Sequence, residues 1–204
     1  MPVYPGDPVV GIIPVTYREE ESITLSQFVT GLHCGTHLDS PFHVIGHPSE
    51  KKTVEKVSLE KCVGDAIVIN VPRGPLEEIT AADLEKYGDE IREVKRVLLN
   101  TGWHKQWEKP EYFKKYPILT VGAAEFLAQL GIYLLGVDMP SLCGTDLAAN
   151  RAAHQTLLGK EIVLIETMAN LSAITKSRIF FVGIPLKIVG REASPIRAVA
   201  IEEE

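Results

Sequence analysis

The sequence predicts an α/β fold built around a mixed sheet. Roughly eight strand candidates stand against three helix candidates in 204 residues. Some apolar runs alternate with polar residues, which is typical of strands with one solvated face, and others are continuous, which is typical of strands buried on both faces. Both patterns in one chain favour a sheet with parallel and antiparallel strands. A hydrophobic content of 45% over this length predicts one domain, residues 1–204, with a sizeable core.

Strand patterns dominate the first half of the chain. A turn sequence at Tyr4-Pro5-Gly6-Asp7-Pro8 comes first. A helix candidate begins at Thr80, which has the residue type of an N-cap, and Asp83 lies three residues later at the capping-box position. The strand candidates of this half are residues 9–15, 26–32, 65–71 and 96–102.

Helices and strands alternate in the second half. Residues 121–131 have helical apolar periodicity and end at a glycine, and residues 146–160 form a second helix candidate. A short helix or turn is expected at 170–174. The strand candidates here are residues 132–138, 161–167, 178–185 and 196–201.

An aromatic segment lies between the two halves. Residues 103–117 contain Trp103, Trp107 and three more aromatic side chains outside any periodic element. We expect a lid or a pocket wall, with Trp103 and Trp107 in contact with a substrate, because pocket walls are commonly aromatic. The alternative is a loop whose rings only cover the edge of the core.

Composition excludes some classes of function. A net charge of −6 without any basic run gives no electrostatic footprint for nucleic acid. No apolar stretch approaches the ~20 residues of a membrane span, and no secretory signal pattern opens the chain, so a cytoplasmic protein is expected. Three widely spaced cysteines favour reduced thiols over a disulfide framework.

Half of the histidines lie in one stretch of eleven residues, His33 to His43. If this stretch is extended, the odd-numbered His33, His37, Asp39 and His43 point to the same side. A straight strand would hold His33 and His37 roughly 13 Å apart, too far for one ion, so the chain must bend. Gly35 is where it bends most easily, and its missing side chain leaves space for an ion.

Imidazole and carboxylate ligands suit Zn, Mn or Fe(II) better than Ca or Mg. Glu166 ends an apolar run, where an unpaired buried carboxylate would be costly, so either a cation binds it or it faces water. Asp138 also ends an apolar strand. It either supports a metal-bound histidine or caps the next segment, and the sequence does not separate the two.

The stretch HCGTHLDSPFH resembles the HxGTHxDxPxH motif of the cyclase family of metal-dependent hydrolases, which includes bacterial kynurenine formamidases and isatin hydrolases. Four further segments carry the similarity along the chain: the turn at Tyr4 to Asp7, Gly136 to Ser141, the pair His154 and Glu166, and Ser194 to Ala198. The resemblance implies a swivelling β/β/α arrangement and a homodimer.

The resemblance also implies a ligand set for two divalent ions. His33, His37 and Asp39 would hold the first, while Asp39 and Glu166 bridge to a second that His154 also binds. Zn and Mn both fit this set, and the sequence does not choose between them. Ions held in this way would activate water to attack an amide carbonyl, and His43 would shuttle the proton to the amine leaving group.

Tyr4 matches an aromatic residue that lines the substrate pocket in the resembling formamidases, although it could be an ordinary turn residue. The family strand that precedes this turn is not expected here. The leading substrate is N-formylkynurenine, a small-molecule amide. The alternatives are ring opening of an isatin-type lactam and, in a different class, a metal-binding protein without catalysis.

Overall fold

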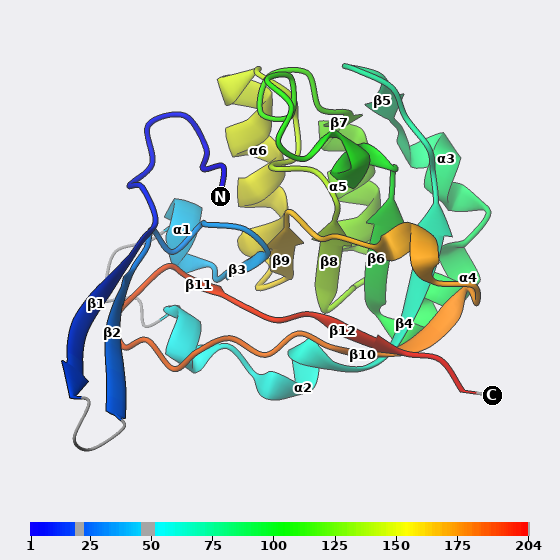
Figure 1. Cartoon of the computed structure of the whole chain (residues 1–204). Helices are drawn as coiled ribbons and strands as arrows, with labels where there is room; N and C mark the ends of the chain where they lie inside the picture. The colour runs from blue at the N-terminus through cyan, green and yellow to red at the C-terminus, as the bar shows by residue number, and fades with distance from the viewer. Residues whose placement is uncertain (19–22, 46–51, 204) are drawn as a thin grey trace.

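The computed structural model describes residues 1–18, 23–45 and 52–203. One eight-stranded sheet forms the centre of the molecule (Figure 1). Its strands, in spatial order, are β11 (Ala193–Pro195), β3 (His37–Asp39), β9 (Val163–Glu166), β8 (Leu134–Val137), β6 (Arg96–Asn100), β4 (Val63–Asn70), β10 (Arg178–Val182) and β12 (Val199–Ile201).

The sheet is mixed, which confirms the expected fold class. Its four central strands, β4, β6, β8 and β9, run parallel, and the strands beyond them pair antiparallel. Only residues 196–198 separate β11 from β12, yet these two strands form opposite edges of the sheet. Because such a short connection cannot span a flat sheet of this width, the sheet must curl.

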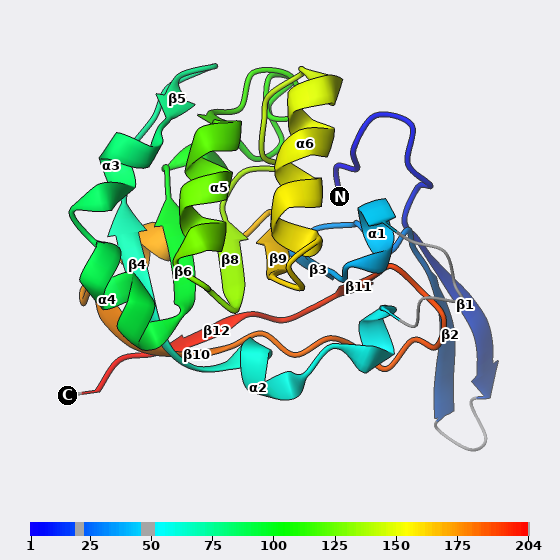
Figure 2. The ribbon, with the colours of Figure 1, turned by 180° about the vertical axis from the view of Figure 1, so that it is seen from behind.

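Four helices cover one face of this sheet, as Figure 2 shows: α3 (Ala81–Glu85), α4 (Gly88–Val94), α5 (Val121–Gln129) and α6 (Leu147–Leu158). The capping box expected at Thr80 and Asp83 is present at the start of α3. The Asp146 carboxylate accepts hydrogen bonds from the backbone N–H groups of Ala148 and Ala149, which fixes where α6 begins.

Side chains on the central strands alternate between two cores. Leu99 and Leu164 pack toward the helices, while Leu98 and Ile165 pack inside the curl of the sheet. This period of two leaves both faces buried, as the continuous apolar runs predicted.

A separate antiparallel hairpin, β1 (Gly11–Arg18) and β2 (Ile23–Val29), projects from the edge of the molecule (Figures 1 and 2). The expected strand at 26–32 therefore belongs to this hairpin and ends at Val29, before the histidine-rich stretch. Turns at residues 32–36 follow it, and extended backbone resumes at β3.

The remaining elements of the described residues are short: α1 (Phe42–Ile45), α2 (Leu59–Cys62), a two-stranded sheet of β5 (Glu78–Ile79) and β7 (Ile118–Leu119), and 3₁₀ turns at Val54–Lys56, Trp103–Gln106 and Leu171–Ala173. Across the described ranges, no helix combines the length and apolar character needed to cross a bilayer.

Candidate metal centre

Two adjacent strands supply three of the expected ligands. In the antiparallel pairing of β3 with β9, His37 lies directly opposite Glu166. Asp39 lies two residues after His37 and so points to the same face, while Leu38 between them packs into the core inside the curl. His37 Nε2 lies 3.6 Å from Glu166 Oε2 and 3.5 Å from Asp39 Oδ1.

Helix α6 supplies His154 from above this face. His154 Nε2 lies 3.2 Å from Glu166 Oε1, and both side chains are buried. The distance depends on the packing of α6 against β9, which places a residue in the middle of a helix over the end of a strand.

His33 reaches the centre from a turn. Its Nδ1 lies 2.9 Å from Asp39 Oδ1, and its ring centroid lies 5.0 Å from that of His37. Gly35 between the two histidines has φ +64°, so the expected bend is present at a position that favours glycine. The space beside Gly35 is not left for an ion, because an added Cβ would lie 2.7 Å from Cε of Met1.

Two backbone carbonyls fix the orientation of the buried imidazoles. His37 Nδ1 lies 2.9 Å from the oxygen of Gly35, and His154 Nδ1 lies 2.8 Å from the oxygen of Asn150. A carbonyl only accepts hydrogen bonds, so each Nδ1 carries the proton. When the imidazoles are neutral, each Nε2 therefore presents a lone pair toward the carboxylates, which is the arrangement of a metal ligand.

These residues fit a divalent cation. His37 Nε2, both carboxylate oxygens of Asp39 and Glu166 Oε1 are buried without a hydrogen-bond partner of acceptable geometry. Single ligand atoms of His33, His37 and Asp39 lie within 4.8 Å of one another, and so do those of Asp39, His43 and His154. Burying such atoms unpaired is costly, and divalent cations would pair them.

A proton on the imidazoles also reduces the cost of burying the neighbouring carboxylates. Burial lowers the pKa of His33, but the neighbouring carboxylates, Asp39 first, outweigh burial and raise the pKa to about 9. Burial likewise opposes charge on His154, whose pKa is raised by Glu166 and Asp39. Burial disfavours the ionised form of Asp39, yet the three motif histidines hold its pKa well below the usual range. The centre therefore attracts positive charge.

His43 lies at the rim of this centre, on α1. Its ring centroid is 4.4 Å from that of His33 and 5.7 Å from that of His154. Burial of the imidazole disfavours its charged form and is the main reason that the pKa of His43 lies below the ordinary value. Asp39 attracts the charged form, while His33 and His154 repel it. His43 has the most exposed side chain among the motif histidines, and it is the one best placed to meet a ligand from solvent.

A pocket of about 390 Å³ opens over the centre. Tyr4 lines it, and the Tyr4 ring packs edge-to-face against Phe113 with centroids 5.6 Å apart. Trp103 and Trp107 are not brought into this pocket. Trp103 is in the core, where its indole donates to the carbonyl of Tyr112, and Trp107 lines a different hollow of about 200 Å³.

Asp138 plays neither of the two roles considered for it. Its buried carboxylate accepts hydrogen bonds from the backbone N–H groups of Thr101 and Gly102 and from the Thr101 hydroxyl, and it lies 3.0 Å from Nδ1 of His104. It therefore holds the turn after β6 and orients His104, which is not one of the candidate ligands.

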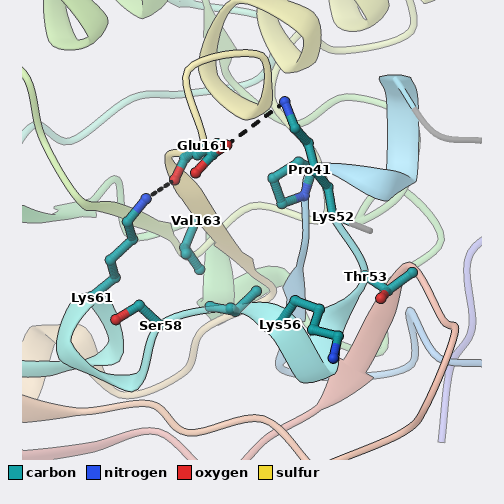
Figure 3. A pocket seen from close by; sticks show the side chains of 9 residues that line it. Pro41, Lys52, Thr53, Lys56, Ser58, Lys61, Glu161 and Val163 are labelled. Carbon is teal, nitrogen blue, oxygen red and sulfur yellow. Dashed lines mark hydrogen bonds and ion pairs between the residues drawn. The ribbon is translucent and has the colours of Figure 1, made fainter. Parts of the chain in front are cut away.

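A second hollow lies beneath Pro41 (Figure 3). Its volume is about 150 Å³, and its charged lining includes Lys52, Lys61 and Glu161. Lys61 donates to the backbone oxygen of Glu161, and Lys52 Nζ lies 3.7 Å from the Glu161 carboxylate. These contacts use two of the lysine ammonium groups within the protein, and the hollow contains none of the candidate metal ligands.

Three side chains at the centre were missed by sequence reasoning. Glu192 Oε1 lies 3.6 Å from His33 Nε2, and Asp7 and Arg151 line the pocket. Asp7 belongs to the quoted turn motif, and Arg151 precedes His154 by three residues on α6, so both had a sequence signal. Glu192 had none, because the edge strand β11 that follows it was not expected.

Comparisons with known proteins place this chain among relatives of known family. A family model described as putative cyclase matches residues 1–142. A kynurenine formamidase from Bacillus cereus is 32% identical over 197 residues, covering 96% of this chain and 89% of that protein. One from Bacillus thuringiensis is 33% identical over 198 residues, covering 96% of this chain and 89% of the relative.

Solved structures share the fold. An isatin hydrolase bound to the product analogue thioisatinate has a TM-score of 0.85 at 22% identity, covering 97% of this chain and 83% of that one. A potential metal-dependent hydrolase with cyclase activity has a TM-score of 0.75 at 26% identity, covering 100% of this chain and 96% of that one. The family match spans the histidine motif and the relatives extend over α6 and β9, so the chain belongs to the putative cyclase family of metal-dependent hydrolases.

Proposed function

We propose that this protein is a metal-dependent amide hydrolase that cleaves N-formylkynurenine to kynurenine and formate. The observation that carries the proposal is the set of buried, unpaired atoms on His37, Asp39 and Glu166. His37 and Glu166 line an open pocket, and Asp39 Oδ1 lies 3.5 Å from His37 Nε2. A site that only stabilised the fold would not need such access. The choice of N-formylkynurenine as substrate rests on the kynurenine formamidase relatives at 32% and 33% identity.

The proposed site binds two divalent ions, Zn or Mn. His33, His37 and Asp39 would hold one ion, Glu166 and His154 would hold the other, and both ions would share the Asp39 and Glu166 carboxylates. Divalent ions supply Lewis acidity at such a centre, which acidifies water and polarises an amide carbonyl. Sharing two carboxylates reduces the repulsion between neighbouring dications.

His43 is the proposed proton shuttle. A lowered pKa keeps its imidazole neutral at pH 7, so it is able to accept a proton from the attacking water. It then donates that proton to the nitrogen of the departing amine. Its position at the rim, within ring contact of both His33 and His154, supports a role between the ligands and the substrate.

Two further features belong to the proposal. Ile12 and Phe28 are register partners on the projecting hairpin, and they are 72% and 62% exposed. Apolar surface of this kind supports a homodimer, which light scattering would test with a Phe28→Glu variant.

The three cysteines are free thiols, which supports a reducing, cytoplasmic location for one domain of residues 1–204.

Side-by-side assays on purified, metal-reconstituted protein test the reaction. We expect turnover of N-formylkynurenine above that of isatin. Faster ring opening of isatin would favour the alternative of a lactam hydrolase. The isatin hydrolase structure supports that alternative only through the similarity of its fold to this chain. Unfolding on chelation together with no turnover of either compound would favour the non-catalytic metal protein.

A further inference from the structure

The pocket over the metal centre has charged groups that the proposed hydrolysis does not use. Arg151 and Asp7 both line it, together with the expected ligands His33, His37, His154 and Glu166. Arg151 lies on α6 three residues before His154, and side chains at this spacing share one face of a helix. Asp7 comes from the turn near the N-terminus, which runs beside α1 and α6 in both views (Figures 1 and 2).

Arg151 differs in its surroundings from three other arginines of this chain, each of which has a carboxylate partner. Arg73 pairs with Asp83, Arg92 with Asp89, and Arg178 with Asp65 and Glu93. Within the described part of the chain, neither Arg151 nor Asp7 has a side-chain hydrogen bond or an ion pair within 4.0 Å. Two opposite charges therefore face one pocket without neutralising each other.

Asn150, the polar residue next to Arg151, already has hydrogen-bond partners within the protein. The Asn150 side-chain oxygen accepts hydrogen bonds from the backbone N–H groups of Leu142 and Cys143 and from the Ser141 hydroxyl, which ties the loop after β8 to α6. Asn150 thus has a structural partner set, and Arg151 beside it has none among the described residues. This contrast leaves the Arg151 guanidinium available to a ligand.

We infer that Arg151 and Asp7 form a clamp for the carboxylate and ammonium groups of an α-amino acid whose side chain carries the amide to be cleaved. The inference rests on the proposed function and deepens it, because it selects zwitterionic substrates over neutral ones. A guanidinium binds a carboxylate through paired, charge-assisted hydrogen bonds, and a carboxylate accepts from an ammonium group. A pocket of about 390 Å³ is within the range of small-molecule sites.

A matched pair of substrates tests the clamp. N-formylkynurenine and ortho-formamidoacetophenone have the same ring, ketone and formamide, but the second lacks the α-amino acid group. We expect metal-reconstituted wild-type protein to prefer the first by at least about tenfold in kcat/KM. In Arg151→Gln this preference falls about tenfold, mainly through KM, and Arg151→Lys restores part of it.

Asp7→Asn tests the other half of the clamp. Its preference for N-formylkynurenine over the analogue acetylated on the α-amine is expected to fall by a similar factor. Arg92→Gln, which removes an exposed guanidinium on α4 outside the pocket lining, is the matched control and keeps the wild-type preference. An unchanged substrate preference in Arg151→Gln would overturn the clamp while leaving formamide hydrolysis intact.

Product binding separates the clamp from the reaction itself. Calorimetric titration of the metal-loaded protein with kynurenine and with 2-aminoacetophenone needs no turnover. If the protein hydrolyses neither formamide, the proposed function fails, and tighter binding of kynurenine that is lost in Arg151→Gln would still support the clamp. Equal binding of the two compounds by wild-type protein would overturn it.

Discussion

His37 and Glu166 face each other across two antiparallel strands, with Nε2 of the histidine 3.6 Å from Oε2 of the glutamate. The register of β3 against β9 therefore creates a ligand pair from residues far apart in the chain. A slip of one residue would turn one of these side chains to the opposite face of the sheet. The metal centre is thus a property of strand pairing as much as of the motif.

Replacing His43 by alanine should separate catalysis from metal binding. We expect His43→Ala to retain the metal content of the wild type and to lose roughly 10²-fold or more in kcat, because only proton transfer is removed. Elemental analysis and steady-state kinetics on the same preparation provide the measurement. His104→Ala, which removes an imidazole outside the candidate ligand set, is the control for metal content. A parallel fall of metal and activity in His43→Ala would instead identify His43 as a ligand beside Asp39 and His154.

Glu166→Gln should empty at least one metal position. The amide has the same shape but loses the negative charge that balances the cations, so we expect reduced metal per chain by elemental analysis. Glu161→Gln is the matched control, because Glu161 lies shortly before β9 with a side chain 57% exposed and pairs with Lys52. Full metal occupancy in Glu166→Gln would contradict the bridging role.

Gly136→Ala should destabilise the folded protein. The added Cβ would lie 2.6 Å from Cδ2 of Leu98 and 2.6 Å from Sδ of Met168, so these core side chains must shift. We expect the free energy of unfolding to fall by about 1 to 3 kcal/mol in a denaturant titration. Gly122→Ala is the control, since an added Cβ there meets nothing within 4 Å and alanine favours helix α5. Equal stability of the two variants would argue against close packing at Gly136.

The capping box of α3 should contribute stability that depends on pH. The backbone N–H of Thr80, followed by the Arg73 guanidinium, lowers the pKa of Asp83 from 3.8 to about 2. A carboxyl with a lower pKa in the folded state stabilises that state above its unfolded value of ~3.9, and the contribution disappears as the pH falls toward 2.

The measurement compares unfolding of the wild type with Asp83→Asn, both free of metal, over this pH range. We expect a constant difference between pH 5 and 7, on the order of 1 kcal/mol for a helix cap, which shrinks below pH 4. A difference that does not change with pH would show that ionisation of Asp83 contributes nothing.

Sequence periodicity alone determined the α/β class, the central strands and the helices at 121–131 and 146–160. These elements have continuous or helical apolar patterns, and their identity follows from local spacing. The ligand types within the motif and the bend at Gly35 were also readable, because glycine tolerates a positive φ at low cost.

Tertiary structure alone decided which of these residues meet. The edge strand β11, the ending of β2 at Val29, the burial of Trp103 and the hydrogen bonds of Asp138 all depend on partners distant in the chain. Local patterns do not encode such pairing, because the free energy that selects it comes from packing and hydrogen bonding across the whole fold. The physical reason is the same for the metal centre: short-range preferences formed α6 and β9, and only their packing brought His154 to within 3.2 Å of Glu166.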